Sequence, residues 1–156
     1  VEGLHALNDS LTYMLPRYEK VKISLGVLTQ IRINDHNRIS TSDTRIIRRM
    51  VRDQQFRDRG PMATMDIWAD VRRGEEKNIY PYQEDADTIF NTALPYELSV
   101  LKPYAEPLLE SIDKGSVHYA EARRLLRFLK PFKGIDSSVV PPNSLLREFI
   151  GPDRKK

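Results

Sequence analysis

Six arginines occupy eighteen positions between Asp43 and Gly60, in the stretch DTRIIRRMVRDQQFRDRG. A guanidinium group is permanently charged, and its planar fork of N–H donors matches the oxygens of a phosphate or carboxylate. At helical spacing, five of the six arginines fall within an arc of roughly 100°: Arg45, Arg48, Arg49, Arg52 and Arg59. Four apolar residues fall on the opposite side: Ile46, Ile47, Met50 and Val51. The pattern predicts a helix that buries one face and offers a row of cations on the other.

The simplest interpretation of this row is a solvated helix face with ion pairs to acidic residues three or four positions away. Asp53 lies four positions after Arg49 and fits that interpretation. Arg45, Arg48 and Arg52, however, mainly neighbour other arginines, and like charges at this spacing cost a few tenths of a kcal/mol per pair. A sequence tolerates that cost more readily if an anion, such as a nucleotide or a nucleic acid, binds the row. The aromatic or lysine-rich surfaces that usually accompany nucleic-acid binding do not adjoin this segment, so a nucleic acid is not the expected partner.

Other common catalytic and metal-binding patterns are missing from the sequence. The chain has no cysteine, which excludes disulfides, thiolate catalysis and cysteine-based zinc sites. Its three histidines, His5, His36 and His118, are far apart and lack the spacing of metal ligands. The sequence contains neither a G-x-S-x-G nucleophile motif nor a G-x-x-x-x-G-K-[ST] phosphate-binding loop.

Composition places the chain among globular proteins with an ordinary core. It has 156 residues, 40% of them hydrophobic, and a net charge of only +3, so its positive charge is strong only locally. No apolar run reaches the ~18 residues that span a bilayer, and no signal peptide is visible. We therefore expect a cytoplasmic protein without a membrane partner. Because the first residue is Val1 rather than Met, we also expect a fragment of a longer protein.

The elements that position the arginines alternate between strands and helices over the first ninety residues. Period-two alternation and apolar runs predict strands over residues 1–4, 21–27 and 87–93. We expect the first two to be neighbours in a parallel sheet whose other strands lie outside this chain. Ser42 or Asp43 is the expected N-cap of the arginine helix, and Gly60-Pro61 should end it. From residue 95 onward the pattern is helical, with amphipathic helices over 96–112 and 116–132.

Together these segments resemble the uridine kinase and phosphoribulokinase family of P-loop kinases, over the C-terminal half of the kinase fold. VEGLHALND resembles the family's strand ending in Glu-Gly, and VKISLGV resembles the next core strand. DTRIIRRMVRDQQFRDRG resembles the lid signature, and YQEDADTIFNTAL the strand that follows it. The stretch from residue 72 to 109 is similar to a bacterial uridine kinase-like subgroup, and the resemblance covers residues 1–112. Typical members place glycine between the last two lid arginines, whereas this sequence has Asp58 there and Gly60 afterwards.

The resemblance implies an α/β fold, namely a partial P-loop kinase with parallel strands flanked by helices. Residues 1–94 would form the C-terminal half of the kinase domain, including an arginine-rich lid over about 42–74. Residues 95–156 would form a helical extension packed on the same domain. The phosphate-binding loop and the catalytic aspartate of such kinases lie upstream of the matched part. The fragment alone is therefore expected to be inactive.

The implied activity is ATP-dependent phosphoryl transfer to a nucleoside, or to another small hydroxyl acceptor, with ATP and Mg²⁺ as cofactors. By the resemblance, Arg52 and Arg57 would be catalytic and face the phosphates. Arg49 and Arg59 would lie nearer the acceptor and bind the substrate.

Three further residues receive roles from the same resemblance. Arg72 and Arg73 would bind the nucleotide cofactor, and Glu2 would orient the metal ion through water. Two alternatives to a kinase stay open, a basic module that binds RNA and a degenerate kinase fold with a regulatory role. A homo-oligomer also stays open, because the helices after residue 95 could cover a partner subunit.

Overall fold

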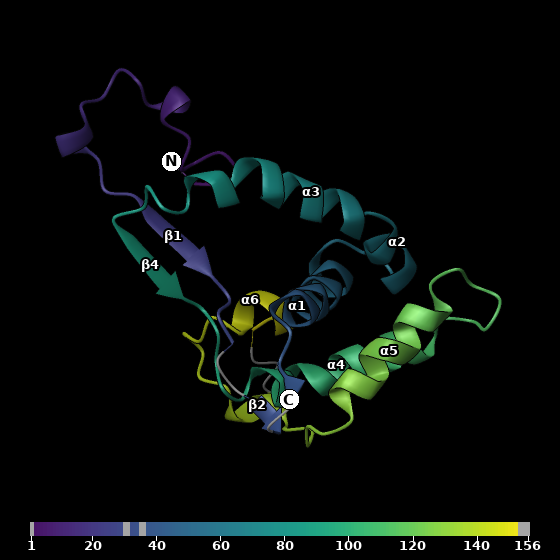
Figure 1. Ribbon diagram of the computed structural model, residues 1–156. Helices are drawn as coiled ribbons and strands as arrows, with labels where there is room; N and C mark the ends of the chain where they lie inside the picture. The colour runs from purple at the N-terminus through teal and green to yellow at the C-terminus, as the bar shows by residue number, and fades with distance from the viewer. Residues whose placement is uncertain (1, 30–31, 35–36, 153–156) are drawn as a thin grey trace. The chain divides into compact units, whose positions relative to one another are not determined.

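A computed structural model describes residues 2–29, 32–34 and 37–152 of the chain (Figure 1). The fold is mixed α/β, with helices predominating and a small parallel sheet of two strands. This confirms the predicted α/β class at the level of secondary structure. In the described part of the chain, no helix is long and apolar enough to cross a membrane.

The chain divides into two compact units, each built from two stretches of sequence. Unit 1 consists of Val1–Gly26 and Ile67–Thr92, and unit 2 consists of Val27–Asp66 and Ala93–Lys156. Unit 1 contains the strands β1 (Ile23–Gly26) and β4 (Thr88–Asn91), the helix α3 (Trp68–Asn78) and the 3-10 turns Asp9–Leu11, Arg17–Glu19 and Tyr80–Tyr82. Unit 2 contains β2 (Arg32–Asn34), β3 (Asn37–Arg38), α1 (Thr41–Phe56), α2 (Pro61–Asp66), α4 (Glu97–Glu110), α5 (Tyr119–Leu129), the 3-10 turn Ser137–Val139 and α6 (Arg147–Ile150).

The parallel sheet of unit 1 pairs β1 with β4, in a register that runs from Ile23 opposite Thr88 to Gly26 opposite Asn91. The strands predicted over 21–27 and 87–93 are thus confirmed. The strand predicted over 1–4 is wrong for its described residues, and Val1 lies outside them. Gly3 has a φ of 117° and its carbonyl accepts the N–H of Ala6. This turn is incompatible with an extended strand, so the first segment is not the neighbour of β1.

Along β1 and the residues before it the polar face is buried and the apolar face is exposed, which is the reverse of a usual half-buried strand. Lys22 and Ser24 are buried, while the alternating Val21, Ile23 and Leu25 are exposed. On β4, both large apolar side chains, Ile89 and Phe90, are exposed as well. Within the described residues, all buried apolar side chains belong to unit 2. A parallel sheet is normally covered on both faces, so the sheet of unit 1 offers apolar surface for further packing.

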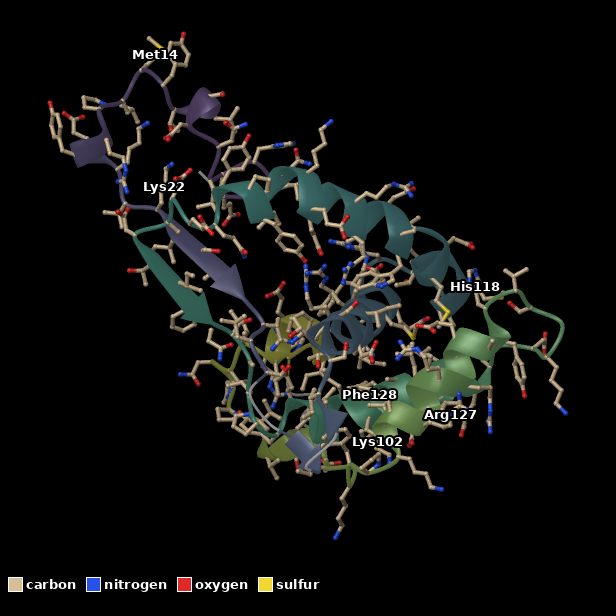
Figure 2. The ribbon with its side chains drawn as sticks, viewed as in Figure 1. Met14, Lys22, Lys102, His118, Arg127 and Phe128 are labelled. Atoms are coloured by element: carbon tan, nitrogen blue, oxygen red, sulfur yellow. The ribbon has the colours of Figure 1, made fainter. Side chains whose placement is uncertain are left out.

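A network of charges, most of them exposed, links separate segments of unit 1. The ammonium of Lys22 lies 2.9 Å from a carboxylate oxygen of Asp9, and the backbone N–H of Lys22 donates to Asp87 at 2.7 Å. Arg17 forms an ion pair with the same Asp87. The pKa of Asp87 is held below its ordinary value, chiefly by the hydrogen bond from Arg17. These contacts attach the loop that carries Arg17 to the start of β1, near Lys22 (Figure 2).

The core of unit 2 is built around α1. As predicted, the apolar face of this helix is fully buried, through Ile46, Ile47, Met50 and Val51. It packs against α4 and α6, and α4 packs in turn against α5. The helix begins two or three residues earlier than predicted, because Ser40 is the N-cap and its hydroxyl accepts the N–H of Asp43 at 3.2 Å. The predicted break at Gly60-Pro61 is confirmed, since α1 ends at Phe56 and α2 begins at Pro61.

Candidate anion-binding site

Three arginines of unit 2 converge on the carboxylate of Asp53, which is fully buried. The distances from the guanidinium nitrogens to the carboxylate oxygens are 3.4 Å for Arg49, 3.0 Å for Arg57 and 3.9 Å for Arg59. Thr64 of α2 donates its hydroxyl to the same carboxylate at 3.3 Å. One negative charge thus faces three positive charges. The cluster of Arg49, Asp53, Arg57 and Arg59, called the Asp53 cluster below, keeps a net positive charge.

The turn after α1 places two of these arginines. The backbone N–H groups of Arg57 and Arg59 both donate to the carbonyl of Asp53, at 3.0 and 3.1 Å. Between them, Asp58 has a φ of 47°, which is the left-handed conformation. Glycine adopts it without strain, and aspartate is one of the few other residues that enter it readily.

The remaining donors of Arg57 and Arg59 are accessible. Their side chains are 47% and 40% exposed, whereas that of Arg49 is 20% exposed. Burial lowers the pKa of Arg49, Asp53 opposes this effect, and the positive charges of Arg52, Arg57 and Arg59 lower the pKa further. The Asp53 cluster therefore has a buried anchor at Arg49 and two outer guanidinium groups that can bind an anion from solution.

Arg52 lies on α1 next to this cluster in sequence but pairs with another element. Its guanidinium contacts Glu148 of α6 at 3.0 Å and lies 6.0 Å from the ring centre of Phe149. The Nε of Arg52 is buried and has no hydrogen-bond partner within the described residues. An anion that uses Arg52 would therefore compete with the carboxylate of Glu148.

Arg48 interrupts the row of cations that helical spacing predicts. It is buried, and its Nε donates to Glu97 of α4 at 2.9 Å while a second N–H contacts the same oxygen. Its guanidinium also stacks over Phe149 at 5.1 Å. Burial raises the pKa of Glu97 in spite of the attraction of Arg48. Arg48 thus holds α4 to α1 and does not belong to the surface that could bind a ligand.

The other predicted site residues lie in unit 1. Arg72 pairs with Glu76 at 3.5 Å, and Arg73 pairs with Asp70, so both form ion pairs within α3. Such exposed pairs along a helix contribute little to stability.

Glu2 is exposed and lines a cavity of about 210 Å³ in unit 1. Gly3 and the apolar residues Leu4, Ala6, Leu7, Ile23, Leu25 and Ile79 form most of its lining, and Glu2 contributes the one carboxylate. Over the described ranges, no group of three or more His, Asp or Glu side chains could hold a metal ion. Mg²⁺ usually combines one or two carboxylates with water and substrate phosphates, so the role of Glu2 at a metal ion stays a prediction.

Helical spacing could not reveal two partners of the arginines, Glu97 and Glu148, or the partner of Asp53 on α2, Thr64. Glu97 lies 49 residues from Arg48, and Glu148 lies 96 residues from Arg52. Thr64 approaches Asp53 only because the chain reverses between α1 and α2. Asp53 itself could be anticipated, since it lies four residues from both Arg49 and Arg57.

Comparisons with models of protein families, with curated proteins and with solved structures give no match for this chain. The function therefore has to be inferred from the chemistry of its own side chains.

Proposed function

We propose that this chain is part of an ATP-dependent kinase that phosphorylates a nucleoside or a similar hydroxyl acceptor. In this proposal the Asp53 cluster binds the phosphate groups. The observation that carries the proposal is the sharing of one buried carboxylate among three guanidinium groups, two of which reach solvent. An arrangement that only stabilised the fold would not need three cations around a single carboxylate.

Phosphoryl transfer suits such a cluster because negative charge spreads over the oxygens of the moving group. Cations that are fixed in place before the reaction stabilise this charge without reorganisation. Arg57 uses one N–H group for Asp53 at 3.0 Å, and a guanidinium has five N–H donors. Its other donors, together with those of Arg59, could bind two oxygens of a phosphate.

The packing of α1 modifies the expected role of the lid. The buried face of α1 fixes the helix against α4 and α6, so its own arginines are held in place. Arg57 and Arg59 follow the end of the helix and are about half exposed. We therefore assign closure over the phosphate to the turn at residues 57–60. Arg52 joins only when Glu148 releases it.

The rest of the catalytic machinery would come from other parts of the polypeptide. The 156 residues contain no phosphate-binding loop, and kinase chemistry requires one to hold ATP. The exposed apolar residues on β1 and β4 support further strands and helices around this sheet, since parallel sheets are normally buried on both faces. The 156-residue chain by itself would bind phosphate without catalysing transfer.

Phosphate binding can be measured on the 156-residue chain by titration calorimetry with ATP and with tripolyphosphate. The double variant Arg57→Gln/Arg59→Gln should weaken binding at least about tenfold, because each charge-assisted hydrogen bond contributes about 1.5–3 kcal/mol. The matched control is Lys77→Gln/Lys114→Gln, which removes two exposed cations that lie outside both the Asp53 cluster and α5. If both variants lose the same affinity, the loss reflects net charge alone. If no binding is measured at millimolar ligand, the phosphate site is refuted.

Catalysis itself requires the full-length protein and a panel of nucleosides, with release of ADP as the readout. Arg57→Lys should retain only part of the activity that is lost in Arg57→Gln, because lysine keeps the positive charge but lacks the planar fork. Phosphate binding without any nucleoside-dependent release of ADP would favour the regulatory alternative over the kinase.

A further inference from the structure

The strongest local excess of charge in the chain lies on α5, outside the proposed phosphate site. Residues 121–133 contain five basic residues and one acidic residue, a net charge of +4, against +3 for the whole chain. The other residues are therefore slightly acidic in sum. This concentration of charge on one helix and the turn after it requires an explanation.

Four of these five cations form a line, called the basic stripe below. Arg123, Arg127 and Lys130 follow the i, i+4, i+7 spacing of one helix face, and Lys133 continues the line after the helix ends. All four are exposed. In the described part of the structure none of them takes part in an ion pair, whereas the neighbouring Arg124 pairs with Asp43 and Glu121. Arg127 is labelled on α5 in Figure 2.

Stabilisation of the helix explains only part of the stripe. Arg127 and Lys130 lie at the C-terminal end of α5, where cations interact favourably with the helix dipole. Arg123 lies in the middle of the helix and adds a like charge four residues before Arg127, which is unfavourable by a few tenths of a kcal/mol. The packing of α5 depends instead on its opposite face, where Ala122, Leu125 and Leu129 are fully buried.

We propose that the basic stripe of α5 binds the phosphate backbone of single-stranded RNA. The helical rise of 1.5 Å per residue places successive cations about 5–6 Å apart along the axis, which forms a linear positive surface for a linear polyanion. Phe128 and Phe132 lie beside the stripe with ring centres 6.0 Å apart, and both are partly exposed. Proteins that bind single strands combine such cations with aromatic side chains on which bases stack.

Two other kinds of negatively charged partner, an anionic membrane and an acidic protein, fit the surface less well. A helix that binds a membrane inserts its apolar face between the lipids, but the apolar face of α5 is buried. A protein interface needs an apolar or aromatic anchor at its centre and is depleted of lysine. Beside the stripe, Phe128 and Phe132 are only partly exposed, and two of the four stripe cations are lysines, so this surface lacks a large exposed apolar centre. RNA binding by the basic stripe goes beyond the kinase proposal and concerns a different surface from the arginines of α1, because Arg48, Arg49 and Arg52 pair with carboxylates and the four stripe cations form no ion pair within the described residues.

The test measures fluorescence anisotropy of a labelled oligouridine of about 20 nucleotides, longer than the site of one small binding domain. The 156-residue chain is titrated into it at several salt concentrations between about 50 and 200 mM. Four phosphate contacts predict a slope of about −3 for the logarithm of the association constant against the logarithm of salt.

Two variants that each remove two positive charges isolate the stripe. Arg127→Gln/Lys130→Gln should make the slope shallower by about 1.4 and weaken binding at low salt. Lys77→Gln/Lys114→Gln removes two other exposed cations and should leave the slope unchanged. All four positions are exposed, so both variants should stay folded, and the loss of the interaction with the dipole of α5 should lower the melting temperature of Arg127→Gln/Lys130→Gln only slightly.

The proposal is overturned if the oligouridine does not bind at low salt, or if both variants lose the same affinity. It is also overturned if vesicles containing phosphatidylserine, or polyglutamate, bind more tightly than the RNA, since the stripe would then serve a membrane or an acidic protein. The Arg57→Gln/Arg59→Gln variant should retain RNA binding, which separates this inference from the phosphate site.

Discussion

Asp53→Asn is the sharpest test of how the Asp53 cluster is held together. The carboxylate is fully buried among Arg49, Arg57 and Arg59 and accepts the hydroxyl of Thr64. Asparagine keeps the size and one acceptor oxygen but removes the charge. Breaking a buried ion pair by removal of one partner typically costs about 3–5 kcal/mol. Because Arg57 and Arg59 are partly exposed, we expect a loss near the lower limit, about 3 kcal/mol, in the free energy of unfolding.

The same variant should become unusually sensitive to anions. Without Asp53 the three guanidinium groups lack their shared partner, so sulfate or phosphate should bind between them in its place. Binding to the folded state stabilises a protein by RT ln(1 + [L]/Kd), which is about 2.7 kcal/mol at a hundredfold excess over Kd. Urea denaturation of wild type and variant, with sulfate and with chloride at equal ionic strength, measures both effects.

Asp43→Asn is the matched control on the same helix. Asp43 is also buried, and it pairs with Arg124 of α5, which retains Glu121 as a second partner. This variant should be destabilised without any additional effect of sulfate. The argument for the Asp53 cluster fails if Asp53→Asn loses less than about 1 kcal/mol, or if sulfate stabilises both variants equally.

Two further predictions concern the turn after α1 and the charges of unit 1. Because Asp58 has a φ of 47°, Asp58→Gly should be close to neutral, whereas Asp58→Val should lose about 1–2 kcal/mol in chemical denaturation; equal stability of the two variants would contradict the left-handed turn. Arg17 and the N–H of Lys22 hold the pKa of Asp87 below its ordinary value of 3.8. Stability from this carboxylate is therefore present above that pH and is lost as the pH falls through the lower pKa of the folded state. The protection of the Lys22 amide against hydrogen exchange, relative to its intrinsic exchange rate at each pH, should fall below about pH 4, and in Asp87→Asn this protection should already be low at neutral pH; protection that does not change with pH in the wild type would refute the contact.

Local sequence determined most of the secondary structure that surrounds the site. The apolar spacing of Ile46, Ile47, Met50 and Val51 predicts both the helix α1 and the face that it buries. Gly60-Pro61 predicts the end of that helix, and the runs around Ile23 and Ile89 predict the two strands. These features depend on periodicity and turn chemistry within about ten residues, so they can be derived from the chain alone.

Tertiary structure decided which charges remain available to a ligand. Arg48 and Arg52 look equivalent to Arg49 in the helical pattern, yet Glu97 and Glu148 reach them from α4 and α6. On α5, Arg124 pairs with Asp43 and Glu121, whereas the four cations of the basic stripe form no ion pair among the described residues, although their spacing in sequence is equally ordinary. A carboxylate 49 or 96 residues away leaves no periodic signal near the arginine that it neutralises.

In the sheet of unit 1 as well, the local sequence predicts the strands but neither their buried faces nor their pairing. Alternation along Val21, Ile23 and Leu25 predicts a strand, but its apolar side is the exposed one and Lys22 faces the buried side. Pairing of β1 with β4 rather than with residues 1–4 also depends on contacts across the chain. The sequence by itself determined where α1 and the two strands form and which side chains share a face, because those properties are local. Only the folded chain brings three arginines to Asp53 while it leaves the basic stripe without an ion pair among the described residues, because electrostatic pairing depends on distance in space.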